Sequence, residues 1–234
     1  MNILLAYKWI KEYLKTELSA EEFAKQISLG GPSIEKWDYS KELDDSIFDI
    51  EITPNRADMA SVIGVAREAS AILPTELLYK EPKIQSSKIK ELPYKVTVND
   101  FELCPRYQSI VIDGITVKDS PEWMTKRLKA AGLNSINNIV DITNYVLLEY
   151  GQPVHAFDYD KLSGNEIIVR KANNGEIFES LDNKSYKLDD SMLVICDEQN
   201  PIGLAGIKGG LSSGITNFTK RIVIEVANFN PISI

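Results

Sequence analysis

The first 52 residues carry a helical pattern followed by a strand pattern. Residues 19–22, Ser-Ala-Glu-Glu, have the spacing of a capping box, and Phe23 and Ile27 give the helix behind it an apolar face. The Gly-Gly-Pro sequence at 30–32 ends that helix. Residues 47–52 alternate apolar and acidic side chains, and this period of two predicts a strand.

A helix of small residues and a linker come next. The helix is expected from about Asp58 to Leu73, where Pro74 ends it. The chain up to this point predicts a small α+β module. Residues 80–93 place two prolines among lysines and serines, which is typical of a linker.

Strand patterns dominate the rest of the chain. Residues 94–98 are strand-like, and residues 106–112 and 115–117 flank Asp113-Gly114, a pair that favours a hairpin turn. After Asp160 the pattern indicates short strands at residues 166–171, 185–188, 192–196, 202–207 and 222–226.

Two helices interrupt these strands. Ser120-Pro121 opens the first as N-cap and first helical residue, and Gly132 closes it. The second runs from about Asn138 to Tyr150 and is closed by Gly151. The whole pattern predicts an α+β fold: a small N-terminal α+β module followed by a larger module of mixed α/β-sheet structure.

Composition narrows the class of protein. The 234 residues are 44% hydrophobic and 26% charged, which is ordinary for a globular protein. The sequence contains no run of about 18 apolar residues, so no membrane span is expected. Residues 1–8 lack the features of a signal peptide. Cys104, Cys196 and the single histidine cannot supply the four ligands of a standard zinc site, and free thiols are favoured over a disulfide.

The charge balance limits how this chain can bind nucleic acid. A net charge of −8 argues against binding along the length of a nucleic acid, since that requires a basic surface. Contact with one end of a nucleic acid remains compatible with this charge. Lys126, Arg127 and Lys129 crowd one predicted helix, as a solvated face or as a weak phosphate-contacting surface.

The helix over residues 138–150 carries the first candidate site. Its apolar stripe is expected to consist of Ile139, Ile142, Val146 and Tyr150. Thr143 lies about 40° from this stripe, so its hydroxyl is expected to be partly buried, with Asn144 beside it. A buried hydroxyl or amide needs a partner. Spacing favours a structural role, in which Thr143 bonds back to the helix and Asn144 holds a loop, over contact with a ligand.

His155, the only histidine, follows this helix in a non-helical stretch after Pro153. A neutral imidazole can donate, accept or relay a proton near pH 7. No serine or cysteine nucleophile motif lies near it. A structural hydrogen-bonding role is the more frequent one for a lone histidine.

Two further features leave their roles open. Glycines at 203, 206, 209 and 210 match neither a dinucleotide-binding nor a phosphate-binding loop, so they permit tight turns or let a ligand approach the backbone. Glu225 interrupts an apolar strand. It either faces solvent, which alternation slightly favours, or accepts a hydrogen bond inside a pocket.

Taken together, these residues resemble the β subunit of bacterial phenylalanyl-tRNA synthetase. The matching segments occur in the order of that family and cover nearly the whole chain. Compound motifs of this length are far more specific than a single glycine pattern. The segments are 52–58 (Ile-Thr-Pro-Asn-Arg-Ala-Asp), 64–68, 104–107 (Cys-Pro-Arg-Tyr), 136–145, 151–158, 204–210, 225–227 and 229–231.

The resemblance implies a B1-like module at residues 1–79, a linker at 80–93 and a B3/B4-like editing module at 94–234. In the family, B3/B4 hydrolyses tyrosine that has been wrongly attached to the phenylalanine tRNA. A site built to bond the tyrosine hydroxyl rejects phenylalanine, because its polar groups would otherwise stay unpaired.

Editing-pocket roles follow from the same resemblance. Glu225 would accept the tyrosine hydroxyl, which reverses the slight preference for a solvent face. His155, Thr143 and Asn144 would lie near the ester and the terminal ribose. Backbone around Gly206 and Gly209 would line the pocket. The residues do not identify a general base; His155 or a substrate hydroxyl would position the water.

The resemblance also implies the setting in which the chain works. Its expected partners are the synthetase α subunit, in a heterotetramer, and the 3′ end of tRNA(Phe), with no membrane and no DNA, in the cytoplasm. Aminoacylation, with its ATP and magnesium, belongs to the α subunit, so this chain needs no cofactor of its own and should not charge tRNA.

Two departures from the family pattern matter. The oligonucleotide-binding-fold insertion that the family usually carries in its first module is replaced by about a dozen residues, 36–46. The family also continues beyond residue 234, so part of the pocket wall is expected to be missing and hydrolysis by this chain alone to be weak. The alternatives are a non-catalytic module that binds tRNA or a partner, and a stand-alone editing factor, which the B1-like module disfavours.

Overall fold

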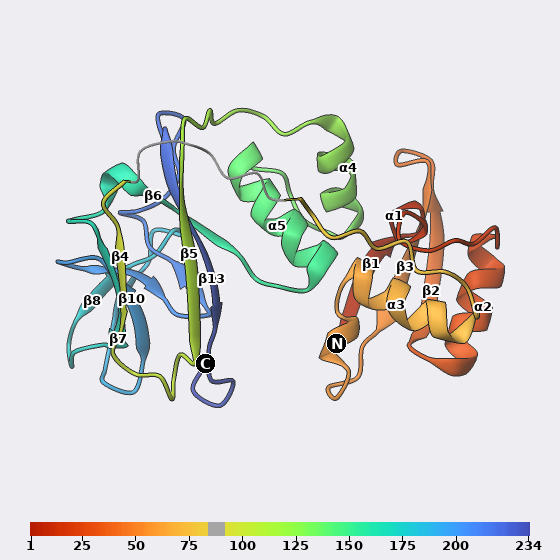
Figure 1. Ribbon diagram of the computed structural model, residues 1–234, viewed down its shortest axis with the longest axis horizontal. Coiled ribbons are helices and arrows are strands. Elements are labelled where there is room, and N and C mark those ends of the chain that lie inside the picture. Colours follow the sequence, from red (N-terminus) through yellow and green to blue (C-terminus); the bar gives the residue numbers. More distant parts are fainter. Residues whose placement is uncertain (84–91) are drawn as a thin grey trace. The chain divides into compact units, whose positions relative to one another are not determined.

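The computed structural model describes residues 1–83 and 92–234, and these form two compact units (Figure 1). Unit 1 comprises Met1–Ser87 and Asp119–Gln152, and unit 2 comprises Lys88–Lys118 and Pro153–Ile234. The linker expected at residues 80–93 falls largely outside the described residues. The α+β fold class is confirmed.

Unit 1 is a three-stranded antiparallel sheet with helices. The strand order is β1-β3-β2. The strands are β1 (Asn2–Ala6), β2 (Ser33–Ser40) and β3 (Asp45–Glu51). The helices are α1 (Tyr7–Lys11), α2 (Ala20–Gly30), α3 (Val62–Ile72), α4 (Glu122–Ala130) and α5 (Asn138–Tyr150), with a short 3₁₀ helix, η1 (Ala57–Met59).

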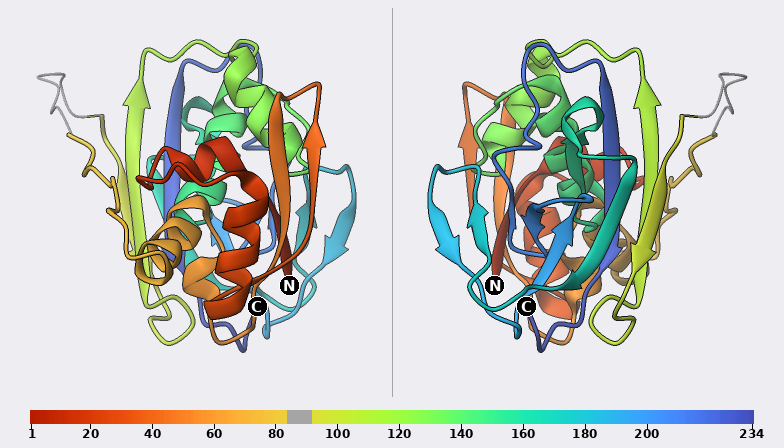
Figure 2. Two further views of the ribbon diagram at one scale, coloured as in Figure 1. Left: turned by 90° about the vertical axis from the view of Figure 1, so that its right-hand side faces the viewer. Right: turned by 90° about the vertical axis from the view of Figure 1, so that its left-hand side faces the viewer.

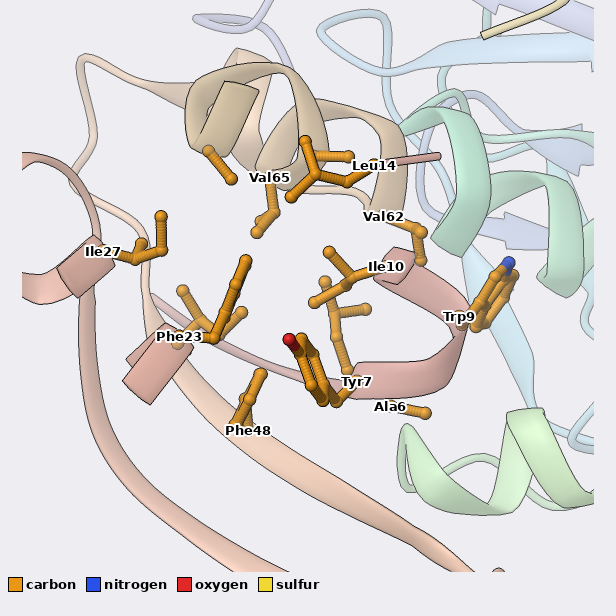
Figure 3. Packing of buried hydrophobic residues seen from close by; sticks show 14 of the residues in the cluster. Ala6, Tyr7, Trp9, Ile10, Leu14, Phe23, Ile27, Phe48, Val62 and Val65 are labelled. Carbon is orange, nitrogen blue, oxygen red and sulfur yellow. The ribbon is translucent and has the colours of Figure 1, made fainter. Parts of the chain in front are cut away.

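Aromatic packing holds the core of unit 1 together (Figure 3). The Tyr7 ring lies 4.9 Å from the ring of Phe23 and 5.2 Å from that of Phe48, measured between centroids. Phe23 and Phe48 stack on each other at 5.7 Å. Because these rings come from α1, α2 and β3, they join both helices to the sheet.

Local capping sets the ends of the helices. Ser19 forms the predicted capping box with Glu22 at the start of α2. Gly151 adopts a left-handed conformation, φ +77°, at the end of α5, as predicted. The start of α3 was predicted too early: the Ser61 hydroxyl accepts from the Gly64 amide at 3.0 Å and caps the helix, so the chain before it forms only η1.

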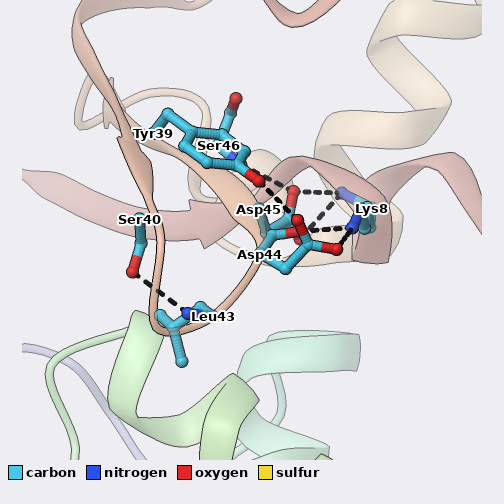
Figure 4. Close-up of polar contacts among 7 residues, drawn as sticks. All are labelled: Lys8, Tyr39, Ser40, Leu43, Asp44, Asp45 and Ser46. Atoms are coloured by element: carbon cyan, nitrogen blue, oxygen red, sulfur yellow. Dashed lines mark hydrogen bonds and ion pairs between the residues drawn. The ribbon is translucent and has the colours of Figure 1, made fainter.

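A tight turn joins β2 to β3, in the position where the related family usually carries an insertion (Figure 4). Both carboxylate oxygens of Asp45 accept from the backbone amide of Lys8 at 3.1 Å. The Lys8 ammonium donates to Asp44 at 2.7 Å, while Asp44 adopts a φ of +50°. These bonds tie the turn to α1, so residues 36–46 complete a hairpin.

The basic residues on α4 are paired with other side chains. Lys126 contacts Glu122 at 2.7 Å, and Lys129 pairs with Glu42. Arg127 pairs with Glu12 and also contacts the ring of Trp9, 5.0 Å from its guanidinium carbon. Arg127 is therefore a packing residue, whereas Lys126 and Lys129 are exposed and form the solvated face that was the first alternative. Contact with phosphate stays a prediction.

Unit 2 is built almost entirely from strands, which face the viewer in the right panel of Figure 2. One sheet has the order β12-β11-β10-β7-β4, a second has β5-β13-β6, and β8 pairs with β9. The strands are β4 (Lys95–Val98), β5 (Arg106–Asp113), β6 (His155–Asp158), β7 (Glu166–Lys171), β8 (Ile177–Glu179), β9 (Ser185–Lys187), β10 (Leu193–Cys196), β11 (Pro201–Leu204), β12 (Lys208–Gly209) and β13 (Arg221–Asn228), with a 3₁₀ turn, η2 (Tyr159–Lys161).

The two larger sheets of unit 2 share one hydrophobic core. Phe157 on β6 and Val223 on β13 pack with Ile167 on β7 and Ile195 on β10. These side chains are 3% exposed or less. One face of the β5-β13-β6 sheet is therefore turned toward the five-stranded sheet, and side chains on that face are removed from water.

The hairpin predicted at Asp113-Gly114 is wrong. β5 pairs with β13 over eight residues, from Asp113 opposite Arg221 to Arg106 opposite Asn228. Gly114 does turn, with φ +73°, but the chain after it is not a partner strand. A long apolar strand from later in the sequence offers β5 a full ladder, which outweighs the short local pairing.

The compact units divide the chain differently from the module boundaries implied by the resemblance. Residues 119–152 lie within the predicted module 94–234, yet they pack into unit 1. The Tyr145 ring stacks on Trp9 at 4.5 Å, and Tyr13 donates to Glu149 at 2.6 Å. The boundaries at 79 and 94 remain predictions about family modules.

Candidate functional site

The β5-β13-β6 sheet places three polar side chains in one row. Glu225 on β13 lies directly opposite Ser109 on β5 and directly opposite His155 on β6. Directly opposed residues of antiparallel strands project from the same face of a sheet. Glu225 is thus the middle member of a row that runs across all three strands.

Glu225 is buried, and the solvent-face preference drawn from alternation is wrong. It is 6% exposed and shares its sheet face with Val223, which is fully buried. Alternation along one strand separates two faces, but it does not say which of them a second sheet will cover. In unit 2 the covered face is the one that carries Glu225.

The surroundings of Glu225 are polar and not cationic. Burial raises the pKa of Glu225 to about 8, and the nearby Tyr107 hydroxyl offsets a smaller part of this rise. Burial also raises the pKa of Tyr94 to about 12 and that of the Cys104 thiol to about 11. The negative charge of Glu225 raises both pKa values further, by less than burial does. Near neutral pH the carboxyl of Glu225 is therefore largely protonated.

His155 is held as a neutral base. Burial lowers its pKa to about 4. Its ring contacts Phe157 edge-to-face, with centroids 4.6 Å apart. On another side lies Gly209: a β-carbon at that position would stand 2.6 Å from the His155 Cε1 atom, far inside contact distance. The bare backbone of Gly209 thus makes room for the imidazole.

The two glycines named from the sequence have different neighbours. Gly209 adjoins His155, whereas Gly206, in a left-handed conformation with φ +70°, adjoins Phe229 and Ile234. Gly206 lies in the turn between β11 and β12, where its backbone conformation favours glycine. Within unit 2, the structure therefore brings together Glu225, His155 and Gly209, and leaves Gly206 with apolar neighbours.

Thr143 and Asn144 belong to α5 in unit 1. The Thr143 hydroxyl donates to the Val140 carbonyl at 2.7 Å, which confirms the structural bond expected for it. Its lone pairs still allow it to accept a hydrogen bond. Asn144 is half-buried.

The buried side of α5 differs from the predicted stripe. Ile142 and Tyr150 are exposed, whereas Asp141 is fully buried. Asp141 accepts from the hydroxyls of Ser120 and Ser135, and from the Ile136 amide at 2.9 Å. Sequence reasoning missed this carboxylate because its partners lie outside the helix: Ser135 and Ile136 in the loop before it, and Ser120 before α4.

Sequence reasoning also missed the hydroxyl groups around Glu225. Tyr94 donates to Ser109 at 2.9 Å, and Tyr107 lies on the same strand and face as Ser109. Only the strand register identifies these hydroxyl groups as neighbours of Glu225. Once β5 and β13 are paired, positions 107 and 109 project from the same sheet face as positions 225 and 227. Register is a tertiary property, so no local pattern reveals it.

Two searches for other site types were negative in the described part of the chain. Among residues 1–83 and 92–234, no group of three or more His, Cys, Asp and Glu side chains is arranged to hold a metal ion. No helix in those ranges is both long and apolar enough to cross a membrane. Cys104 and Cys196 are buried free thiols.

Comparison with known proteins defines the class. The family model for the B3/4 domain matches residues 103–234, and the chain belongs to this family. The curated relatives are phenylalanine–tRNA ligase β subunits. The protein of Carboxydothermus hydrogenoformans is 47% identical over 203 residues, which cover 87% of this chain and 25% of that protein. These matches confirm the resemblance found in the sequence.

Two further matches cover nearly the whole chain. The β subunit of Rhodopirellula baltica is 41% identical over 236 residues, covering 99% of this chain and 34% of its own length. An N-terminal fragment of the phenylalanyl-tRNA synthetase β subunit from Pyrococcus horikoshii has a similar fold, with a TM-score of 0.54 at 14% identity, over 100% of this chain and 70% of the fragment. The chain thus spans about a quarter of the length of the Carboxydothermus hydrogenoformans protein and about a third of the Rhodopirellula baltica protein.

Proposed function

We propose that this chain contributes the editing site of a phenylalanine–tRNA ligase β subunit, which hydrolyses tyrosine wrongly esterified to tRNA(Phe). One observation carries the proposal: Glu225, a buried acid with no cationic neighbour among the described residues, lies directly across the sheet from His155. This pair stands inside the B3/4 domain match. The names of the curated relatives supply phenylalanine and its tRNA, and the family resemblance supplies tyrosine as the amino acid to be removed.

The burial of Glu225 supports selection of tyrosine over phenylalanine. The tyrosine hydroxyl would donate to its carboxyl, whereas phenylalanine would leave that group unpaired and out of water. An unpaired buried polar group costs about 1–3 kcal/mol, which corresponds to roughly 5- to 150-fold in selectivity. One side chain can therefore supply much of the discrimination that the synthetic site lacks.

His155 supports the hydrolytic step. Water attacks the ester carbonyl, the bond to the ribose oxygen breaks, and free tyrosine and tRNA are released. A neutral imidazole can orient that water, or the ribose hydroxyl beside it, by donating from one nitrogen and accepting at the other. With a pKa of about 4, His155 is a weak base, so a positioning role fits it better than full proton removal.

The remaining assignments follow from the family resemblance. Thr143 and Asn144 would approach the ester and the ribose, and the Gly206 and Gly209 backbone would line the pocket. The α subunit, in a cytoplasmic heterotetramer, would bind ATP and magnesium and carry out aminoacylation, and the 3′ end of tRNA(Phe) would move between the two sites.

Deacylation of tyrosyl-tRNA(Phe) by the complete α/β enzyme tests the proposal. We expect Glu225→Ala to lower hydrolysis by at least about tenfold, because the hydroxyl loses its buried partner. Glu179→Ala, an exposed acid on β8, is the matched control and should hydrolyse normally. Unchanged hydrolysis by Glu225→Ala would show that the pocket is assigned wrongly. A wild-type enzyme that binds the tRNA end without hydrolysis would favour a non-catalytic binding module.

A further inference from the structure

Two buried polar atoms in unit 2 lack partners at the same place. The Tyr107 hydroxyl and the Glu225 Oε2 atom are the buried side-chain polar atoms without a well-formed hydrogen bond within the described residues, and they lie close enough for the Tyr107 hydroxyl to lower the pKa of Glu225. Such unpaired atoms are rare and costly in a folded protein. Tyr107 lies opposite Ala227, two residues along β13 from Glu225, so both side chains project from the same sheet face.

Two neighbouring polar groups already have partners. The Tyr94 hydroxyl donates to Ser109 at 2.9 Å, and the Cys104 thiol lies 3.6 Å from the Arg106 carbonyl oxygen. The unpaired groups at this position are thus one hydroxyl donor, on Tyr107, and one carboxyl acceptor, on Glu225.

A single hydroxyl group would satisfy both of them, because it donates one hydrogen bond and accepts others. An ammonium group would satisfy Glu225 but not the Tyr107 proton, and a carboxylate would satisfy only Tyr107. Glu225 can accept in either protonation state, since a neutral carboxyl keeps its carbonyl oxygen. The pair therefore selects for a group that is donor and acceptor at once.

We propose that Tyr107 is a second specificity-determining residue, which donates to the phenolic oxygen of the tyrosyl group while Glu225 accepts its proton. This inference rests on the proposed editing function. Phenylalanine, which lacks the oxygen, would offer neither protein group a hydrogen-bond partner. Two hydrogen bonds to the hydroxyl, one with each residue, give a greater selectivity for tyrosine over phenylalanine than Glu225 alone provides.

The test compares two esters on the complete α/β enzyme. For Tyr107→Phe we expect kcat/KM for tyrosyl-tRNA(Phe) to fall about tenfold, the size of one neutral hydrogen bond. Hydrolysis of phenylalanyl-tRNA(Phe), slow in both enzymes, should not fall. The ratio between the two esters is the diagnostic quantity, because a purely structural role would lower both together.

Tyr159→Phe is the matched control. The Tyr159 hydroxyl is also buried in unit 2, but it donates to the Pro93 carbonyl at 2.7 Å and lies near Asn165, away from Glu225. It should change the two esters equally, if at all. Thermal unfolding of each variant establishes that it is folded.

Two results would overturn the inference. An unchanged ester ratio in folded Tyr107→Phe, or an equal fall for both esters, gives Tyr107 no part in selection while the proposed function stands. Failure of the wild-type enzyme to hydrolyse tyrosyl-tRNA(Phe) refutes the proposed function itself and this inference with it.

Discussion

Replacing Glu225 by glutamine should change how the stability of unit 2 depends on pH. Glutamine keeps the shape of the side chain but cannot ionise. The pKa of Glu225 is raised from 4.5 to about 8 in the folded chain, so the folded state holds a proton that the unfolded state releases. Stability is then greatest below pH 4.5 and falls as the pH rises toward 8.

His155 works in the opposite direction over a different range. Its pKa is lowered from 6.5 to about 4, so the unfolded state binds the extra proton and stability rises with pH between 4 and 6.5. Each group contributes a slope of about 1.4 kcal/mol per pH unit in its window. The two slopes cancel between pH 4.5 and 6.5. Between pH 6.5 and 8 only Glu225 titrates, and the free energy of unfolding falls by about 2 kcal/mol.

Hydrogen exchange of the β13 amides at several pH values, corrected for the intrinsic rate, measures this loss. The three tryptophans, Trp9, Trp37 and Trp123, all lie in unit 1, so their fluorescence follows the other unit and serves as an internal reference. A unit-specific probe is needed because a chain of two compact units need not unfold in one step.

We expect wild-type protection to weaken between pH 6.5 and 8, and Glu225→Gln protection to stay level. Glu179→Gln, which removes an exposed carboxyl from β8, should behave as wild type. Equal pH slopes in wild type and Glu225→Gln would refute the reasoning, because the buried carboxyl would then not be protonated in the folded chain.

Three further predictions follow from single contacts. Gly209→Ala should lower tyrosyl-tRNA(Phe) hydrolysis about 10- to 100-fold, because the new β-carbon displaces the His155 ring. Ser19→Ala should destabilise unit 1 by about 1 kcal/mol, seen in urea unfolding followed by tryptophan fluorescence, because it removes an N-cap. Cys104 and Cys196 should resist a thiol reagent at pH 8 until denaturant is added, since burial protects them and raises their pKa values to about 11 and about 12.

Each of these has a control. Gly203→Ala meets its nearest neighbour, on Ile195, at an ordinary 3.6 Å and should keep its activity; equal loss in both glycine variants would contradict the His155 explanation. Ser19→Ala should leave hydrolysis intact. Rapid labelling of either thiol in the native chain would show that the core around it opens readily.

Local chemistry predicted some of the helix ends and several of the strands. Ser19 caps α2 and Gly151 closes α5 because each bond involved spans only a few residues. The strand at residues 166–171 was predicted with the bounds that the structure shows. Where a partner lay farther along the chain the prediction failed, as at Asp113-Gly114.

The residues of the candidate site were accessible from sequence only through resemblance. Spacing alone favoured structural roles for Thr143 and His155 and a solvent face for Glu225. For Thr143 the structural bond is present, whereas Glu225 is buried. Tyr107 was named only as part of a family motif and given no role, because a tyrosine in a strand is usually an ordinary core residue.

By itself, the sequence determined the α+β class, the caps of α2 and α5, the family and the residue types available for chemistry, because these depend on neighbours within a few positions or on compound motifs. It misplaced the start of α4, where Pro121 and not Ser120 is the N-cap, because the Ser120 hydroxyl donates to Asp141 instead. Tertiary structure decided which face of β13 is covered. The covered face carries Glu225, and its burial raises the pKa of Glu225 to about 8. It also decided that Ser109, Glu225 and His155 form one row. Strand register joins residues more than a hundred positions apart, and burial depends on what packs against a face.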